Sequence, residues 1–251
     1  YAQIKKKTRP SRLPKLEGIE RLEVEEFFTH HKDQKYYGEM ESRSIMEKYG
    51  IPLVPGKLAG SKEEAIEFAN QNGYPVVLKI SSPNLLHKSD VKGVAVGLQN
   101  ESRVAAAWEE ILKNVRFIHP DAVIHGCMVE TMAKPGREVI LGMKRDLNFG
   151  PLMMFGLGGV FVELYQDVSF RVAPLSGEDA LEMIQETRAG TLLQGFRNEP
   201  QADLAGIVDC LLRLSQLAMD FPAISEMEIN PLVVYPKGEG VITLDCRLSL
   251  S

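Results

Sequence analysis

The sequence predicts an α+β protein built of two lobes, and three observations support this fold class. Short extended segments follow one another closely in the middle of the chain, which is typical of a largely antiparallel sheet. Helical segments with start and stop signals lie on both sides of them. A stretch at 131–136 that contains proline and glycine interrupts the pattern. We therefore expect an arm or linker over 1–38, a first lobe over 39–130 and a second lobe over 131–251.

Helices are predicted where apolar residues recur every three or four positions between capping and breaking residues. Ile45, Met46 and Tyr49 form such a pattern, which Gly50 ends. The pair Ser61 and Glu64 forms a capping box that predicts a further helix. The other helices are expected over 100–115, 178–187 and 201–219, with one short helical turn of the arm over 22–28.

Strands are predicted from apolar and β-branched runs bounded by glycine, proline or polar turn residues. The expected strands are 75–80, 93–98, 122–130, 137–144, 152–155, 168–172, 226–235 and 240–247. The last two strands are separated by the turn-rich segment 236–239, so they should pair antiparallel.

The composition is that of an ordinary globular protein, with 44% hydrophobic and 25% charged residues among 251. The net charge of −5 gives no support for binding a nucleic-acid backbone or an anionic membrane. No apolar run is long enough to span a bilayer. The three cysteines are odd in number and lie in apolar sequence, so we expect a cytoplasmic protein with reduced thiols and neither a disulfide nor a zinc site.

His87 is the first candidate for chemistry. It lies in a polar loop after the apolar run 75–80, in which Lys79 is the one charged residue. An imidazole can act as a nucleophile and an ammonium group binds phosphate, so the two together suggest phosphoryl transfer. A loop histidine that bonds Ser89 or Asp90 is the alternative.

Two glutamates flank the interruption at 131–136. Glu130 ends one predicted strand and Glu138 begins the next. A nucleotide base could lie across this hinge and bond its backbone, with Glu138 accepting from ribose hydroxyls. An ordinary turn with two exposed carboxylates explains the same pattern.

The last strand pair carries a candidate metal site. Alternation places Glu226, Glu228 and Asn230 on one face of a strand, and antiparallel pairing brings Asn230 to Asp245. Carboxylate and amide oxygens are suitable ligands for Mg²⁺. A polar face turned to solvent is the alternative.

Two weaker candidates involve phosphate. The glycine-rich turn with Gly158 and Gly159 would let backbone N–H groups approach an anion, although it matches neither a dinucleotide-binding fingerprint nor a P-loop. Arg171 could clamp a phosphate or carboxylate, and it could equally cap a sheet edge.

The order of these motifs resembles the ATP-grasp subunit or domain of ADP-forming acyl-CoA synthetases (acetate–CoA ligase, ADP-forming), which are relatives of succinyl-CoA synthetase. The resemblance covers roughly 37–251. It depends on six motifs in the family's order, namely 77–83, 86–90, 130–138, 145–151, 155–159 and 228–232 with Asp245.

The resemblance implies a reversible reaction in which acyl-CoA, ADP and phosphate give the free acid, CoA and ATP. It implies that His87 carries the phosphoryl group as phosphohistidine. It also implies that Asn230 and Asp245 bind Mg²⁺, while Glu228 orients the phosphohistidine or the metal shell.

The nucleotide site follows from the same resemblance. Lys79 would hold nucleotide phosphates, Glu130 and Met132 the adenine hinge, and Glu138 the ribose. Gly93 would allow the backbone to approach a phosphate. The implied cofactors are therefore ATP or ADP and Mg²⁺.

The resemblance further implies a CoA-binding α subunit or fused domain as the partner, and thus a hetero-oligomer. Two departures from the family pattern are Lys92 and Asn198, each at a position where glycine is expected. A nucleotide-sensing regulatory domain of a synthetase-like fusion is the alternative function, and an ATP-grasp ligase without a phosphohistidine is a third.

Overall fold

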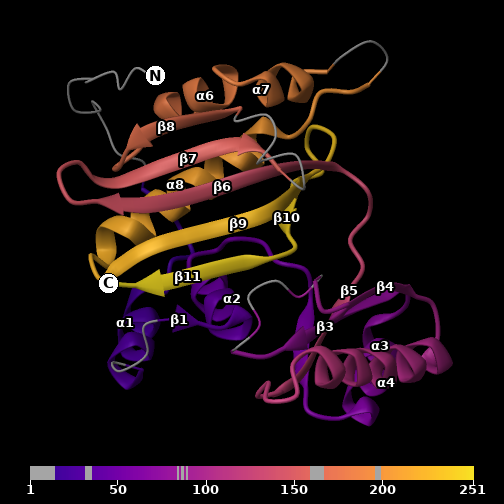
Figure 1. The fold of residues 1–251 in the computed structure, drawn as a ribbon. Coiled ribbons are helices and arrows are strands. Elements are labelled where there is room, and N and C mark those ends of the chain that lie inside the picture. The colour runs from indigo at the N-terminus through magenta and orange to yellow at the C-terminus, as the bar shows by residue number, and fades with distance from the viewer. Residues whose placement is uncertain are drawn as a thin grey trace. The chain divides into compact units, whose positions relative to one another are not determined.

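The protein is an α+β fold, as predicted, in which every pair of named strands is antiparallel (Figure 1). The computed structural model describes residues 15–31, 36–83, 85, 88, 90–158, 167–195 and 199–251. These residues divide into two compact units. The smaller unit is Val54–Lys134, and the larger unit joins the described residues before Val54 to Pro135–Ser251. None of the helices in the described part of the chain combines the length and the apolar character that a membrane span requires.

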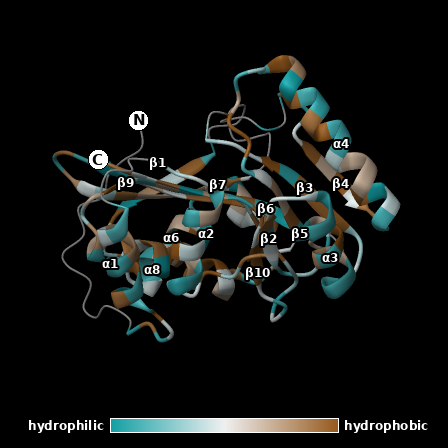
Figure 2. Cartoon of the chain, turned by 90° about the horizontal axis from the view of Figure 1, so that it is seen from below, coloured by the Kyte–Doolittle hydropathy of each residue, from teal (hydrophilic) through white to brown (hydrophobic). Residues whose placement is uncertain are grey.

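The smaller unit is a four-stranded sheet in the order β2-β5-β3-β4 with two helices packed on it. The Ser61 hydroxyl caps α3 by accepting from the Glu64 N–H at 3.2 Å. The Glu64 carboxylate accepts from the Gly60 N–H at 2.9 Å, one residue before the partner expected in a capping box. The amphipathic α4 buries Trp108 and Ile111 in the core of this unit (Figure 2). The elements are β2 Gly56–Ala59, α3 Lys62–Asn72, β3 Val76–Ser81, β4 Val94–Leu98, α4 Glu101–Ile118 and β5 Gly126–Thr131.

The larger unit is a seven-stranded sheet in the order β1-β11-β9-β6-β7-β8, with β10 also paired to β9. Its central strands are β9 and β6. Strand β6 pairs with β7 on one side and with β9 on the other. The helices are α1 Arg21–His30, α2 Glu39–Lys48, α6 Gly177–Gln185, α7 Arg188–Leu193 and α8 Leu204–Asp220. The strands are β1 Tyr36–Tyr37, β6 Arg137–Asp146, β7 Gly150–Leu157, β8 Val168–Val172, β9 Ile224–Val234, β10 Val241–Thr243 and β11 Cys246–Leu250.

Strand alternation gives this large sheet two different faces. Helices α6, α7 and α8 pack on one face, and Figure 2 shows α6 and α8 on the same side of the sheet. Met227 and Ile229 of β9 are buried in the core of this unit. Each such fully buried side chain contributes about 1.5–3 kcal/mol of transfer free energy. Alternate residues of the same strand, Glu228 and Asn230, therefore lie on the opposite face. The packing of the helices thus determines which face can carry polar chemistry.

The segment 240–247, predicted as one strand, is two strands in the structure. β10 and β11 pair with consecutive parts of β9 and are separated by Leu244 and Asp245. Pro231 lies in β9 opposite this interruption and has no N–H to donate to a ladder. Two backbone hydrogen bonds join β9 to the interruption. The Asn230 N–H donates to the Asp245 carbonyl at 3.0 Å, and the Leu244 N–H donates to the Pro231 carbonyl at 3.1 Å.

The division into units differs from the expected domain boundaries. The break expected within 131–136 falls at Lys134 and Pro135, but the smaller unit begins at Val54 and not at residue 39. Helix α1, assigned to an arm, packs in the core of the larger unit, where Phe28 meets Phe221 with ring centroids 5.0 Å apart. Such long-range partners leave no trace in the local periodicity. Residues 1–14 and 32–35 of the expected arm lie outside the described residues.

Asp203 connects α8 to the turn between β9 and β10. One carboxylate oxygen accepts from the Gly206 N–H at 3.1 Å and caps the helix, and the other accepts from Gly238 and Gly240, each at 3.0 Å. Burial raises the pKa of Asp203, but the hydrogen bonds from these backbone N–H groups outweigh it and leave the pKa below its ordinary value. The ionised carboxylate therefore stabilises the fold.

Replacement of Asp203 by alanine should lower the free energy of unfolding by about 2–3 kcal/mol at pH 7. Because the native pKa is depressed, this contribution is complete above the unfolded pKa of roughly 4 and declines as the pH falls through the native pKa. Urea unfolding at pH 7 and at pH 3.5 measures the effect, with Asp209→Ala as the control, a half-exposed carboxylate of the same helix that pairs with Arg213. An equal loss at both pH values would contradict the charged role of Asp203.

Candidate functional site

His87 lies outside the described residues, as do Asn84, Leu86 and Ser89. The two ends of its loop are described and are tied together. The Ile80 N–H, in β3, donates to the Gly93 carbonyl at 2.7 Å, and the Gly93 N–H donates to the Lys88 carbonyl at 2.8 Å. The described residues on either side of His87 are thus bonded to one another within the smaller unit.

Gly93 is required at this anchor for packing. A Cβ atom there would lie 2.5 Å from Ile80 Cγ2 and 2.9 Å from the Lys88 carbonyl oxygen, so any side chain would displace the loop. Lys92 has a φ of 50° and is the one non-glycine residue in the described part of the chain with positive φ. The glycine that the family pattern expects at position 92 would adopt this left-handed conformation without strain. The predicted approach of Gly93 to a phosphate stays a prediction.

Lys79 and Glu130 form a buried ion pair in the smaller unit. Lys79 Nζ lies 2.7 Å from Glu130 Oε2, and the side chains are 12% and 3% exposed. In the register of β3 and β5, Lys79 pairs with Met128, so Glu130 is its diagonal neighbour on the same face of the sheet. The structure therefore brings together two residues that the sequence assigned to the phosphates and to the adenine hinge separately.

The backbone at the predicted hinge already makes hydrogen bonds. The Met132 N–H donates to the Pro75 carbonyl at 3.0 Å, and the Thr131 N–H donates to the Pro55 carbonyl at 3.0 Å. The Met132 side chain is 44% exposed. Glu138 belongs to the larger unit and is exposed at the start of β6. The N–H groups of residues 131 and 132 are thus engaged inside the smaller unit.

The backbones of Asn230 and Asp245 lie next to each other, and their role as metal ligands stays a prediction. On β6, Val139 pairs with Leu232 and Leu141 pairs with Ile229, so β9 carries an extra residue at this point, which is a β-bulge. The bulge lies at Asn230, whose N–H meets the Asp245 carbonyl at 3.0 Å. A bulge redirects a side chain out of the regular ladder, and bulges are frequent beside functional sites.

The Glu228 side chain contacts both Asn230 and Arg247. Its Oε1 accepts from Asn230 Nδ2 at 3.4 Å, and its Oε2 accepts from Arg247 Nη2 at 2.9 Å. Arg247 was given no role from the sequence, although the antiparallel register that pairs it with Glu228 was available from the predicted hairpin. The side chains of Glu228, Asn230 and Arg247 thus form a cluster on this sheet, and the Asp245 backbone adjoins it at Asn230.

The donor set at this cluster fits a magnesium ion that also binds phosphates. In the described part of the chain no three His, Cys, Asp or Glu side chains group as a complete metal cage. Mg²⁺ rarely uses such a cage, since it keeps waters and takes one or two protein oxygens together with substrate phosphates. Asp245 and Asn230 supply that number of hard oxygens.

The other two candidates for phosphate binding are Arg171 and the glycine-rich turn with Gly158. Their described contacts are with other residues of the fold. Arg171 lies on the helix side of the sheet, with Nη2 2.7 Å from Glu186 and 3.5 Å from Glu182 of α6. The hydrogen bond with Glu186 raises the pKa of Arg171. Gly158 packs so closely that a Cβ would lie 2.6–2.8 Å from the Val139 backbone, and Gly159 lies outside the described residues. The structure thus favours the sheet-capping alternative for Arg171.

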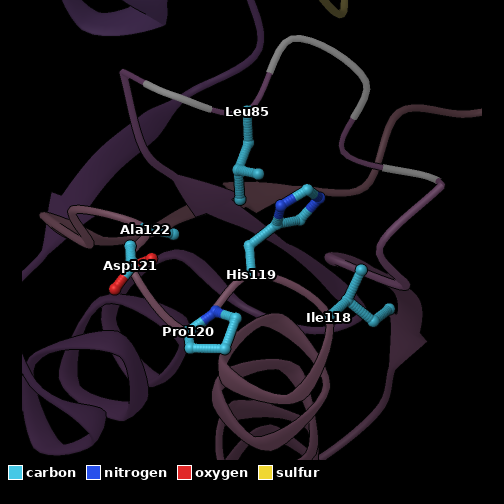
Figure 3. Close-up of a pocket in the computed structure, with 6 residues that line it drawn as sticks. All are labelled: Leu85, Ile118, His119, Pro120, Asp121 and Ala122. Atoms are coloured by element: carbon cyan, nitrogen blue, oxygen red, sulfur yellow. The ribbon is translucent and has the colours of Figure 1, made fainter.

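A pocket of about 230 Å³ opens at the end of α4 in the smaller unit (Figure 3). It is lined by Leu85, Ile118, His119, Pro120, Asp121 and Ala122, and the His119 ring extends toward Leu85. None of the residues proposed to bind nucleotide or metal lines this pocket. We therefore do not place the nucleotide there.

Comparison with known proteins identifies the family of the chain. The family model described as "ATP-grasp domain" matches residues 29–250. The β subunit of ADP-forming acetate–CoA ligase II from Pyrococcus furiosus is 45% identical over 213 residues, which are 84% of this chain and 90% of that subunit. The ADP-forming 4-hydroxybutyrate–CoA ligase of Nitrosopumilus maritimus is 38% identical over 97% of this chain, which corresponds to 35% of that longer protein.

A solved structure is also similar to this chain. It is the acetyl-coenzyme A synthetase 1 of Ca. Korarchaeum cryptofilum with coenzyme A and Mg-AMPPCP, in which a phosphohistidine segment points towards the nucleotide-binding site. The TM-score is 0.79 at 42% sequence identity, and the match covers 92% of this chain and 100% of that one. On the family match and these similarities, the protein belongs to the ATP-grasp family, among the β subunits and domains of ADP-forming acyl-CoA synthetases.

Proposed function

We propose that this chain is the nucleotide-binding, phosphoryl-transferring component of an ADP-forming acyl-CoA synthetase. The overall reaction converts acyl-CoA, ADP and phosphate to the free acid, CoA and ATP, and its cofactors are adenine nucleotide and Mg²⁺. The structural observation that supports the proposal is the bulge in β9 at Asn230, whose backbone N–H donates to the Asp245 carbonyl at 3.0 Å. The phosphate-binding residue Lys79 supports it from the smaller unit.

The proposed chemistry divides one difficult transfer into simpler ones. A ring nitrogen of His87 receives the phosphoryl group from the partner, and the terminal oxygen of ADP then attacks the phosphorus. The P–N bond breaks as the new P–O bond of ATP forms, and the imidazole leaves without the phosphoryl group. Such transfers depend mostly on positioning and on neutralising charge.

Residues of this chain supply that positioning. The Lys79 ammonium pairs with Glu130 at 2.7 Å and carries the positive charge that we propose binds nucleotide phosphates. Asn230 and Asp245 would hold Mg²⁺, which neutralises phosphate charge when bound. Glu138, exposed at the start of β6, is our candidate for the ribose hydroxyls.

The partner in this proposal is a CoA-binding α subunit or a fused domain, so the working enzyme is a hetero-oligomer or a longer chain. The name of the Pyrococcus relative, a β subunit, supports the first form, and the greater length of the Nitrosopumilus relative supports the second. We also infer a cytoplasmic location from three buried cysteine thiols. Burial raises the pKa of Cys127 and of Cys210 to about 12, so these thiols stay protonated.

Labelling with [γ-³²P]ATP and Mg²⁺ tests the proposal. The chain should acquire an acid-labile, base-stable label, which is the property of a phosphohistidine, and ADP should remove it. ATP formation should require the CoA-binding partner, tested with a panel of acyl-CoAs. Nucleotide binding without label would favour the regulatory alternative, and full synthetase turnover by the isolated chain would contradict the two-component scheme.

A further inference from the structure

Arg247 lies beside the proposed metal ligands, and the proposed reaction gives it no role. It lies on β11 directly opposite Glu228 of β9. Its Nη2 donates to Glu228 Oε2 at 2.9 Å, while the other oxygen of that carboxylate accepts from Asn230 Nδ2 at 3.4 Å. Glu228 therefore links Arg247 to Asn230 through both of its oxygens.

This link determines the orientation of the Asn230 amide. An amide offers one oxygen acceptor and one nitrogen donor. Since the nitrogen of Asn230 is turned to Glu228, its oxygen is turned away from that carboxylate. The oxygen is the atom that a hard cation prefers. Holding Glu228 in place therefore keeps Asn230 in the orientation that metal binding needs.

The same link restrains Glu228 as a competing ligand. An ionised carboxylate is a stronger ligand for Mg²⁺ than a neutral amide, and Glu228 lies only two positions from Asn230 on the same face. The Arg247 guanidinium offsets the charge of Glu228 and engages one of its oxygens. Without this partner, Glu228 could turn and coordinate the ion itself.

Fold stability does not explain the pair. The Arg247 side chain is 57% exposed and that of Glu228 is 23% exposed. Ion pairs with such access to water contribute little to folding, because solvent screens them. Any large effect of Arg247 should therefore be found at the cation and not in the unfolding curve.

We propose that Arg247 is a positioning residue of the magnesium site, which holds Glu228 as an acceptor for Asn230 and keeps its carboxylate off the ion. The proposal rests on the proposed function, because it takes Asn230 and Asp245 as the metal ligands. Removal of Arg247 should strengthen cation binding in the absence of nucleotide while it slows phosphoryl transfer. A change that only damaged the structure would weaken both.

The test measures Mn²⁺ binding by electron paramagnetic resonance on the chain with its partner, without nucleotide. Arg247→Met should tighten Mn²⁺ binding about five- to tenfold, since a carboxylate becomes available and a positive charge is lost. Transfer of label from the phosphorylated enzyme to ADP should slow by at least about tenfold. Adding Glu228→Gln to Arg247→Met should return Mn²⁺ affinity to that of the wild type, and Arg247→Lys should restore part of the transfer rate.

Lys144→Met is the matched control. Lys144 is exposed on β6, and its register partner on β9 is Glu226, so the variant removes one positive charge from the same sheet while the pair of Arg247 with Glu228 stays in place. It should leave both measurements near wild type, and an effect as large as that of Arg247→Met would show that charge alone is responsible and overturn the positioning role.

The ligand variants separate the two proposals. If Asn230→Ala and Asp245→Asn leave Mn²⁺ binding unchanged, the metal site itself is misplaced and the proposed function fails at that point. If they weaken Mn²⁺ binding while Arg247→Met does not tighten it, the role of Arg247 alone is overturned.

Discussion

Replacement of His87 by alanine is expected to abolish ATP formation by the complete enzyme, with a loss of at least about 1,000-fold. Alanine offers no nitrogen on which the phosphoryl group can be held, so the two-step transfer loses its carrier. The ³²P label on this chain should disappear as well. ADP binding should persist, because the residues proposed to bind nucleotide, Lys79 among them, are unchanged.

His119→Ala is the control for the His87 variant. His119 belongs to the same unit and lines the pocket at the end of α4, where we place no part of the reaction (Figure 3). This variant should keep both the label and the synthetase activity. A phosphohistidine label that survives in His87→Ala would move the carrier to another histidine and refute the assignment.

Replacement of Lys79 by methionine should have two separate effects. It removes the Lys79 charge from the buried Glu130 carboxylate, and breaking a buried ion pair in this way costs about 3–5 kcal/mol of folding free energy. It also removes the ammonium that we propose binds nucleotide phosphates, so ADP affinity should fall by at least about tenfold. Urea unfolding and calorimetric titration with ADP measure the two effects.

A double variant distinguishes stability from binding. Lys79→Met combined with Glu130→Leu replaces the pair by apolar side chains and should recover much of the stability, but not the affinity for ADP. Lys62→Met is the matched control, since Lys62 forms an exposed pair with Glu109 at 2.9 Å in the same unit and should cost no more than about 1 kcal/mol. Recovery of ADP binding in the double variant would exclude Lys79 as a phosphate ligand.

Local signals in the sequence predicted most elements of the fold. The cap at Ser61 and the hydrophobic period that follows it lie within one helix, and both appear in α3. Strand alternation also predicted that Asn230 and Asp245 would meet, because the two strands are close in the chain and pair antiparallel. Where a contact joins neighbours in the sequence, its pattern is visible there.

Contacts between distant segments were not predicted. Helix α1 lies in a charge-rich stretch, and only its packing against Phe221 shows that Phe28 belongs to a core. In the sequence, Arg171 is a single cation in a predicted strand. The structure shows that it pairs with Glu182 of α6 and with Glu186, which directly follows this helix. The pairing of Lys79 with Glu130 likewise requires the register of β3 and β5.

By itself, the sequence determined the α+β class, the family and the residue types available for phosphoryl transfer, because these depend on motif order and on short-range periodicity. Only the tertiary structure decided which charges neutralise one another, namely Lys79 with Glu130 and Arg171 with Glu186. The reason is physical. An ion pair depends on distance and burial, and both are set by strand register and by the packing of segments that lie far apart in the chain.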